Sequence, residues 1–179
     1  LVMFISDHGD NFGEQGWQYH FSNVTDAGNR VPLYILEPGQ EDGREIDERV
    51  SLRDLYGTIL KRSGDQGDDL IDILDEPERS ESVLESYWYN RDGKTLDKYR
   101  FNQFAFVNDD EKFVRRNNEW LCSQIANGAP ETTFKPLPTD TNPIEELDLP
   151  SERKSYLRDR FHEYEAFSKN VLEFSSLSM

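Results

Sequence analysis

The order of apolar and polar segments predicts an α/β fold followed by a smaller antiparallel sheet with a terminal helix. Two short apolar runs, residues 1–5 and 31–36, flank a glycine-rich polar loop, and an amphipathic segment follows at residues 51–63. Strand, loop, strand and helix in this order are typical of an α/β layer. Short β-type segments then alternate with turn residues, which indicates an antiparallel sheet. We therefore expect two domains, at residues 1–79 and 80–179.

The two apolar runs have the pattern of buried strands. Residues 1–5 are short, continuous and apolar, as in a strand covered on both faces. Residues 31–36 form a second such run, with Pro32 near its start, where a strand tolerates proline. We expect both to be central strands of one sheet, with the helix at 51–63 packed on its face.

Residues 51–63 carry the clearest helical pattern of the chain. Ser51 and Asp54 fit a capping-box type of helix start, and Gly64 fits a helix end. Apolar residues recur at helical spacing and predict one buried face. That face consists of Leu52, Leu55, Tyr56, Ile59 and Leu60.

The second half of the chain reads as strands and a final helix. Candidate strands separated by turn residues, including those at 91–93 and 108–110, are 83–89, 99–107, 112–116 and 119–122. The proline-rich residues 132–150 predict an extended connection. A last helix should begin at Ser151, with one apolar face. That face comprises Leu157, Phe161, Tyr164, Phe167 and Val171.

The composition excludes several classes of function. The 36 acidic residues exceed the 20 basic ones, so the net charge is −16 and a nucleic-acid partner is not expected. No run approaches the ~18 apolar residues of a membrane span. Aromatic residues make up 12% of the chain, which argues against wholesale disorder. Acidic residues spread along the chain favour adaptation to high salt, although an ordinary acidic protein is the alternative.

The chain has one cysteine and starts inside an apolar run. Cys122 alone cannot form an internal disulfide, and we expect it to be a small packed residue in a strand. Residue 1 is not Met and already lies within a strand-like segment. We therefore expect the chain to begin in the middle of a fold, and the sequence does not predict its compartment or oligomeric state.

The first signal of chemistry is the tripeptide Asp7-His8-Gly9. It follows the first predicted strand, and ligands of open α/β sheets lie at the carboxyl ends of strands. Adjacent Asp and His side chains offer a carboxylate oxygen and an imidazole nitrogen to one ion, and Gly9 allows a sharp turn. Taken alone, the tripeptide also fits a structural turn with no ligand.

Further motifs follow this tripeptide in a fixed order. Ser6-Asp7-His8-Gly9 leads to Gly13-Glu14-Gln15-Gly16, and His20 comes four residues later. R-V-P-L at 30–33, E-P-G at 37–39 and D-L-Y-G-T-I-L at 54–60 complete the array. The array resembles the sulfatase family of the alkaline phosphatase superfamily, whose last motif usually has proline at the position of Gly57.

The resemblance is specific over residues 1–64 and loose over residues 80–168. In the latter part, residues 104–116 look like the family's strand pair around a lysine. The resemblance implies that residues 1–79 are the C-terminal part of an alkaline-phosphatase-like mixed or parallel sheet domain. Residues 80–179 then correspond to the family's antiparallel C-terminal subdomain with its final helix.

The resemblance also implies an activity and a cofactor. Sulfatases cleave sulfate esters with a formylglycine made from Cys or Ser, and a divalent ion holds this nucleophile and the sulfate. Asp7 and His8 match one pair of metal ligands, with Ca²⁺ favoured and Mg²⁺, Mn²⁺ or Zn²⁺ as alternatives. The family's Asp-Asp pair and its C-x-P-x-R nucleophile segment are not in this chain, and Cys122 does not fit that segment. We therefore expect this chain alone to be inactive.

His20 is the candidate catalytic residue. It matches a family position that contacts the sulfate or protonates the leaving oxygen, and an imidazole suits proton donation near neutral pH. Many sulfatases have a lysine two residues later, where this chain has Ser22. The alternative is a loop histidine between Tyr19 and Phe21. Asp10 and Glu14 are weaker candidates as further ligands, and a loop role is preferred for Glu14.

Two other functions stay open. Phosphodiester or phosphonate ester hydrolases and phosphotransferases of the same superfamily also use an Asp-His pair, often with Mn²⁺ or Zn²⁺. A non-catalytic fragment or divergent homologue is the third hypothesis. The sulfatase reading predicts a small-molecule or saccharide sulfate ester as the partner, and a C-x-P-x-R segment upstream would favour it.

Overall fold

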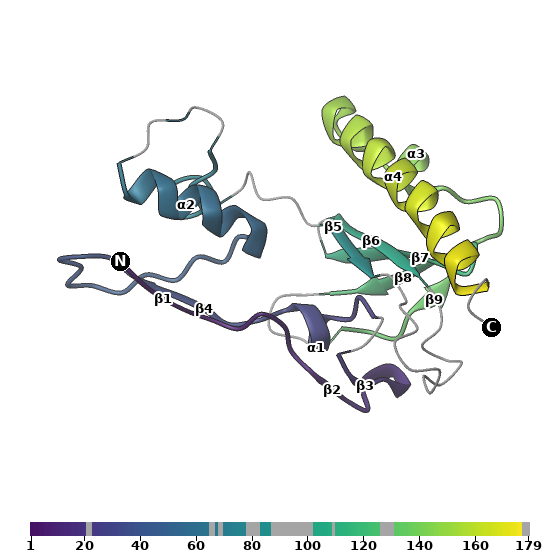
Figure 1. Cartoon of the computed structure of the whole chain (residues 1–179), viewed down its shortest axis with the longest axis horizontal. Coiled ribbons are helices and arrows are strands. Elements are labelled where there is room, and N and C mark those ends of the chain that lie inside the picture. The colour runs from purple at the N-terminus through teal and green to yellow at the C-terminus, as the bar shows by residue number, and fades with distance from the viewer. Residues whose placement is uncertain are drawn as a thin grey trace. The chain divides into compact units, whose positions relative to one another are not determined.

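A computed structural model of the chain describes residues 1–20, 23–64, 67, 70–77, 83–86, 102–108, 110–125 and 131–176 (Figure 1). The chain forms two compact units. The first unit comprises Leu1–Ser6 and Pro32–Ser82, and the second comprises Asp7–Val31 and Val83–Met179. The domain boundary near residue 80 stays a prediction, and the loop after the first strand packs with the second unit.

In the first unit, the two predicted apolar strands do pair with each other. Strand β1 (Val2–Ile5) runs antiparallel to β4 (Leu33–Leu36) in a two-stranded sheet. The expectation that they are buried, central strands is wrong for the described residues, since Phe4 is 66% exposed and Tyr34 67% exposed. Side chains alternate along a strand, and only the face with Met3 is half-buried. A strand with apolar side chains on both faces is typical of a sheet that lies between two covering layers. The two-stranded sheet of β1 and β4 is partly covered on one face only.

The predicted helix exists but presents a different face to the unit's interior. It consists of a 3-10 turn, η2 (Leu52–Asp54), and α2 (Leu55–Arg62). Tyr56 and Ile59 of the predicted apolar face are exposed, whereas Gly57 and Thr58 are buried. The reason is a close approach of the chain at residues 71–73.

Gly57 and Thr58 make this approach possible. A Cβ on Gly57 would lie 2.5 Å from the Ile71 carbonyl oxygen, so only glycine fits there. The Thr58 hydroxyl accepts a 3.1 Å hydrogen bond from the Ile73 amide. The predicted Ser51 cap is not formed, because its side chain makes no capping hydrogen bond. Gly64 ends the helix with φ +98°, as the sequence predicts.

A cluster of charges around Arg62 connects the parts of the first unit. Its guanidinium lies 2.9 Å from Glu37 after β4, 2.7 Å from the buried Asp72 and 2.8 Å from Asp75. One cation thus joins the helix to two segments of chain. The three carboxylates outnumber it, so the cluster carries a local net charge of about −2.

The second unit contains the predicted antiparallel sheet. Its order is β5-β6-β7-β8-β9, and the strands are β5 (Val83–Ser86), β6 (Gln103–Asn108), β7 (Glu111–Arg116), β8 (Glu119–Gln124) and β9 (Lys135–Pro136). Asn117 and Asn118 turn the β7–β8 hairpin with positive φ angles of 48° and 64°, a conformation that asparagine tolerates. The predicted turn at residues 91–93 lies outside the described residues. All described strand pairs are antiparallel. The described residues contain both helices and small sheets, in agreement with an α/β fold, and the alkaline-phosphatase-like mixed or parallel sheet stays a prediction.

The final helix, α4 (Ser151–Ser176), lies over one face of this sheet (Figure 1). The core between them is aromatic: Phe104 contacts Phe161 and Tyr164 of α4 at centroid distances of 5.3 Å and 5.6 Å. Leu157 and Tyr164 are buried as predicted, but Phe167 is 52% exposed. A 26-residue helix is ~39 Å long, and five strands span only ~19 Å, so the sheet cannot cover its whole length.

The connection before α4 is less extended than predicted. It contains β9 and a short helix, α3 (Pro143–Glu146). The Asn142 side chain caps α3 by accepting a 3.2 Å hydrogen bond from the Ile144 amide, and proline favours the first helical turn. Ile144 is thereby placed in the core.

Cys122 has the packing role that the sequence predicts. It lies in β8 and packs against the aromatic core. Burial and the nearby Glu111 carboxylate raise the pKa of its thiol to about 11. A thiol with this pKa is a poor nucleophile at neutral pH. In the described part of the chain, no helix has the length and apolar character needed to cross a membrane.

Candidate metal and catalytic site

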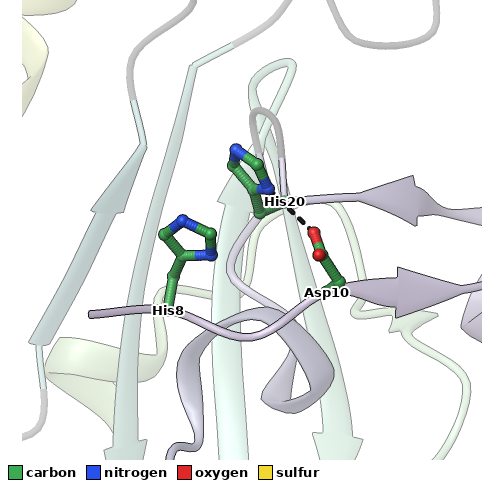
Figure 2. A group of neighbouring side chains, drawn as sticks. All are labelled: His8, Asp10 and His20. Carbon is green, nitrogen blue, oxygen red and sulfur yellow. Dashed lines mark hydrogen bonds and ion pairs between the residues drawn. The ribbon is translucent and has the colours of Figure 1, made fainter. Parts of the chain in front are cut away.

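The predicted site residues lie around a small hairpin in the second unit. Strand β2 (Asn11–Phe12) pairs antiparallel with β3 (Gln18–Tyr19), and Asn11 lies opposite Tyr19. The next residues outward, Asp10 and His20, therefore face each other. Their side chains meet, with Asp10 Oδ1 2.8 Å from His20 Nδ1 (Figure 2).

His8 lies in the loop between β1 and β2, two residues before Asp10, and its side chain lies beside that of His20. The His8 ring stacks on the His20 ring, with centroids 4.0 Å apart and an interplanar angle of 29°. Nδ1 of His8 lies 3.0 Å from the Gly9 carbonyl oxygen. Figure 2 shows both imidazoles side by side with Asp10 next to His20.

Asp7 lies beside His8 at the edge of this group. Its Oδ1 accepts a 3.0 Å hydrogen bond from the His8 amide, and its Oδ2 lies 3.8 Å from His8 Nε2. The Asp7 side chain is 87% exposed and accessible to an incoming ion. The structure thus brings the sequence-predicted residues Asp7, His8 and His20 into one neighbourhood, and their roles there stay predictions.

The sequence names Asp10 only as a weaker candidate ligand and does not predict its pairing with His20. The signal for it was present in the spacing, because a short hairpin over residues 11–19 pairs the residues just before and after it. Glu14 has the loop role that the sequence favours, since its carboxylate accepts a hydrogen bond from the Phe12 amide. Ser22, which replaces the family's lysine, lies outside the described residues.

Gly9 is required by a close contact of the backbone. Its amide donates a 2.9 Å hydrogen bond to the Gly28 carbonyl. A Cβ at this position would lie 2.2 Å from the Ala27 carbonyl oxygen. The glycine of Asp7-His8-Gly9 therefore lets the ligand segment lie directly against α1 (Asp26–Asn29).

Buried polar side chains hold the hairpin in place. The side-chain Nδ2 of Asn11 donates a 2.8 Å hydrogen bond to the Tyr19 backbone carbonyl. Its Oδ1 accepts a 2.7 Å hydrogen bond from the Thr25 hydroxyl. Both side chains are almost fully buried. Trp17 lies in the loop of the hairpin, and the Arg116 guanidinium lies over its ring, 5.3 Å from the centroid of the Trp17 ring. These contacts fix the hairpin next to the Asp10–His20 pair.

Lys112 of β7 anchors the following segment to the sheet. Its ammonium group is buried, with the side chain 1% exposed. It donates to the Val24 carbonyl at 3.0 Å and pairs with the carboxylates of Asp26 and of Glu131, the latter at 2.8 Å. Glu131 also accepts hydrogen bonds from the Asp26 amide and from the Gln15 side chain, each 3.0 Å long. One lysine and one glutamate thus connect the site loop to the five-stranded sheet.

Comparisons with known proteins agree with the motifs. The chain is 36% identical over 95 residues to a choline-sulfatase of Rhizobium meliloti, a match that covers 49% of this chain and 18% of that protein. It is 39% identical over 64 residues to arylsulfatase K of Danio rerio, covering 36% of this chain and 12% of the relative. A sulfatase of Formosa agariphila matches 68% of this chain and 25% of its own length at 24% identity.

These matches confirm the resemblance to the sulfatase family. The matches span only 12% to 25% of the length of these three relatives. No protein-family model matches the chain, and no solved structure matches it significantly.

Proposed function

We propose that this chain supplies part of the active site of a sulfate-ester hydrolase that requires a divalent metal. The observation that carries the proposal is the cluster of His8, His20 and Asp7 on a loop whose sequence motifs match sulfatases. Such a reaction needs metal ligands and a proton donor within reach of one ester. The stacking of the two imidazoles, with centroids 4.0 Å apart, supports the proposal, because both side chains could reach one ester.

Asp7 and His8 are the proposed metal ligands. A carboxylate oxygen and an imidazole nitrogen are both common ligands of divalent ions, and the exposure of both side chains leaves them accessible. The family resemblance favours Ca²⁺. When bound, the ion would act as a Lewis acid toward the sulfate oxygens. The further ligands and the formylglycine nucleophile would come from outside this chain.

His20 is the proposed donor of a proton to the leaving oxygen. Its Nδ1 faces Asp10, so the Asp10 carboxylate orients the ring and favours a proton on that nitrogen. Nε2 points away from this hydrogen bond and is the atom available to the ester.

The experiment uses the full-length enzyme and three variants, Asp7→Asn, His8→Ala and His20→Ala. The metal-ligand variants should lose both metal and orders of magnitude in kcat. His20→Ala should keep its metal and lose rate chiefly on esters with poor leaving groups, which need protonation. His162→Ala, at an exposed position of α4, is the matched control and should behave like the wild type. Full metal content and full activity in Asp7→Asn would contradict the proposal.

A phosphodiester or phosphonate ester hydrolase, or a phosphotransferase, is the second candidate. The imidazole of His8 favours it, because nitrogen ligands suit Zn²⁺ and Mn²⁺ better than Ca²⁺. Rates on a matched pair of aryl sulfate and aryl phosphate esters, each with Ca²⁺ and with Zn²⁺, separate the two. Faster sulfate cleavage with Ca²⁺ supports the sulfatase, and the reverse supports the alternative.

A further inference from the structure

We propose that His8, Asp10 and His20 form a binding site for a transition-metal ion such as Zn²⁺, a ligand set that shares His8 with the Asp7–His8 pair and has Asp10 and His20 in place of Asp7. Each of the three residues offers a ligand atom, and these atoms all lie within 4.8 Å of one another. Asp7 does not belong to this group. The carboxylate that completes it is Asp10, which the sulfatase motifs leave without a function.

The distances suit one small ion. Ligand atoms bound at about 2.0–2.2 Å from one ion lie about 3 Å apart from each other. Asp10 Oδ1 and His20 Nδ1 are 2.8 Å apart, so an ion needs only a small widening of this pair. His8 lies beside this pair (Figure 2), and because the three ligand atoms lie within 4.8 Å of one another, its exposed side chain has to move closer when an ion binds.

The chemistry of the donors selects the class of ion. Two imidazoles and one carboxylate are a common three-residue set for Zn²⁺ and Fe²⁺, with water in the open positions. Ca²⁺ prefers six to eight oxygen ligands and finds few of them here. We therefore expect Zn²⁺ to bind this site more tightly than Ca²⁺.

The hairpin holds two of the three ligands before any ion arrives. Asp10 and His20 flank the β2–β3 ladder, and Asn11 next to Asp10 is buried and hydrogen-bonded at both ends of its amide. Little order has to be created on binding, which favours affinity.

The test is calorimetric titration of the metal-free 179-residue chain with ZnCl₂ and, separately, with CaCl₂. One Zn²⁺ should bind per chain, more tightly than Ca²⁺. Asp10→Asn and His20→Ala should each weaken Zn²⁺ binding at least about tenfold, since even residues behind metal ligands cost that much. His162→Ala, at an exposed position of α4, should leave the affinity within about twofold of wild type.

A second measurement needs no variant. Zn²⁺ should shift the imidazole NMR signals of His8 and His20 in the wild-type chain and leave those of His162 unchanged. Zn²⁺ binding that is lost in Asp7→Asn and kept in Asp10→Asn would overturn the proposal. Zn²⁺ binding no tighter than Ca²⁺, or equal shifts at all three histidines, would overturn it as well. No readout uses an ester, so failure here is distinct from failure of the proposed hydrolase.

Discussion

Replacing Lys112 by methionine should destabilise the second unit strongly. The Lys112 side chain is 1% exposed, its partner Glu131 5% and Asp26 22%, so the three charges are largely removed from water. Methionine keeps most of the volume and removes the ammonium. Two carboxylates are then left close together without their cation, and breaking a buried ion pair in this way costs about 3–5 kcal/mol. That is a large share of the ~5–15 kcal/mol by which a domain is stable.

Urea unfolding of the chain measures this loss. The matched control is Lys135→Met in β9 of the same sheet, where the side chain is exposed and the expected change is within about 0.5 kcal/mol. Adding Glu131→Gln to Lys112→Met removes one of the stranded charges. The double variant should therefore lose less than the sum of the two single variants.

The same substitution should disturb the site at a distance. The Lys112 ammonium donates hydrogen bonds to the Val24 carbonyl and the Asp26 carboxylate. Asp26 begins α1, and the Gly28 carbonyl of the same helix accepts the hydrogen bond from the Gly9 amide. The imidazole NMR signals of His8 and His20 should then move in Lys112→Met and stay in Lys135→Met. A loss below about 1 kcal/mol, the usual size for an exposed pair, would refute the reasoning.

Three further predictions concern packing, the thiol and salt. Gly57→Ala should destabilise the first unit by about 1–3 kcal/mol, because its Cβ would lie 2.5 Å from the Ile71 carbonyl oxygen. Gly43→Ala, with no atom within 4 Å of its Cβ, is the control, and equal urea midpoints for the two would contradict this account. Cys122 should react slowly with thiol reagents at pH 8 and quickly in urea, because burial raises its pKa to about 11 and disfavours the thiolate; equal rates would count against it. Because the pKa of the Cys122 thiol is higher in the folded chain than in the unfolded one, the free energy of unfolding depends on pH. The contribution of the protonated thiol to stability is present below the thiol's ordinary pKa and is lost as the pH rises toward 11. The unfolding midpoint should rise from low to multimolar KCl, as the net charge of −16 is screened, and a flat or falling curve would argue against salt adaptation.

The elements that the sequence predicts best are those that pack against one another in the second unit. The strands after residue 80 and helix α4 follow their patterns, because Phe104, Trp120 and Leu157 supply one another's cover. The spacing of apolar residues along α4 predicts which face of the helix is apolar, but it does not predict how much of that face the sheet covers. Phe167 belongs to the predicted apolar face and is nevertheless exposed, because α4 is longer than the sheet is wide.

Other features depend on contacts that no local pattern records. The buried side of α2 is set by the approach of residues 71–73 to Gly57, which overrides the apolar stripe through Tyr56 and Ile59. Asp10 meets His20 through the register of a hairpin with two residues in each strand. The family motifs point to Asp7, His8 and His20 from sequence alone, and the structure adds the hydrogen bond between Asp10 and His20.

The Lys112–Glu131 anchor also sets an order of events for a growing chain. Asp26 and its partner Glu131 are 105 positions apart, and Lys112 is 86 positions from Asp26. Contacts of such separation are slow to form, and chains emerge from the ribosome with the N-terminal side first. The β2–β3 hairpin, with two residues in each strand, is too short to be stable by itself. It can therefore be fastened to the five-stranded sheet only after residue 131 has been synthesised, so the site loop is among the last parts of the second unit to become ordered.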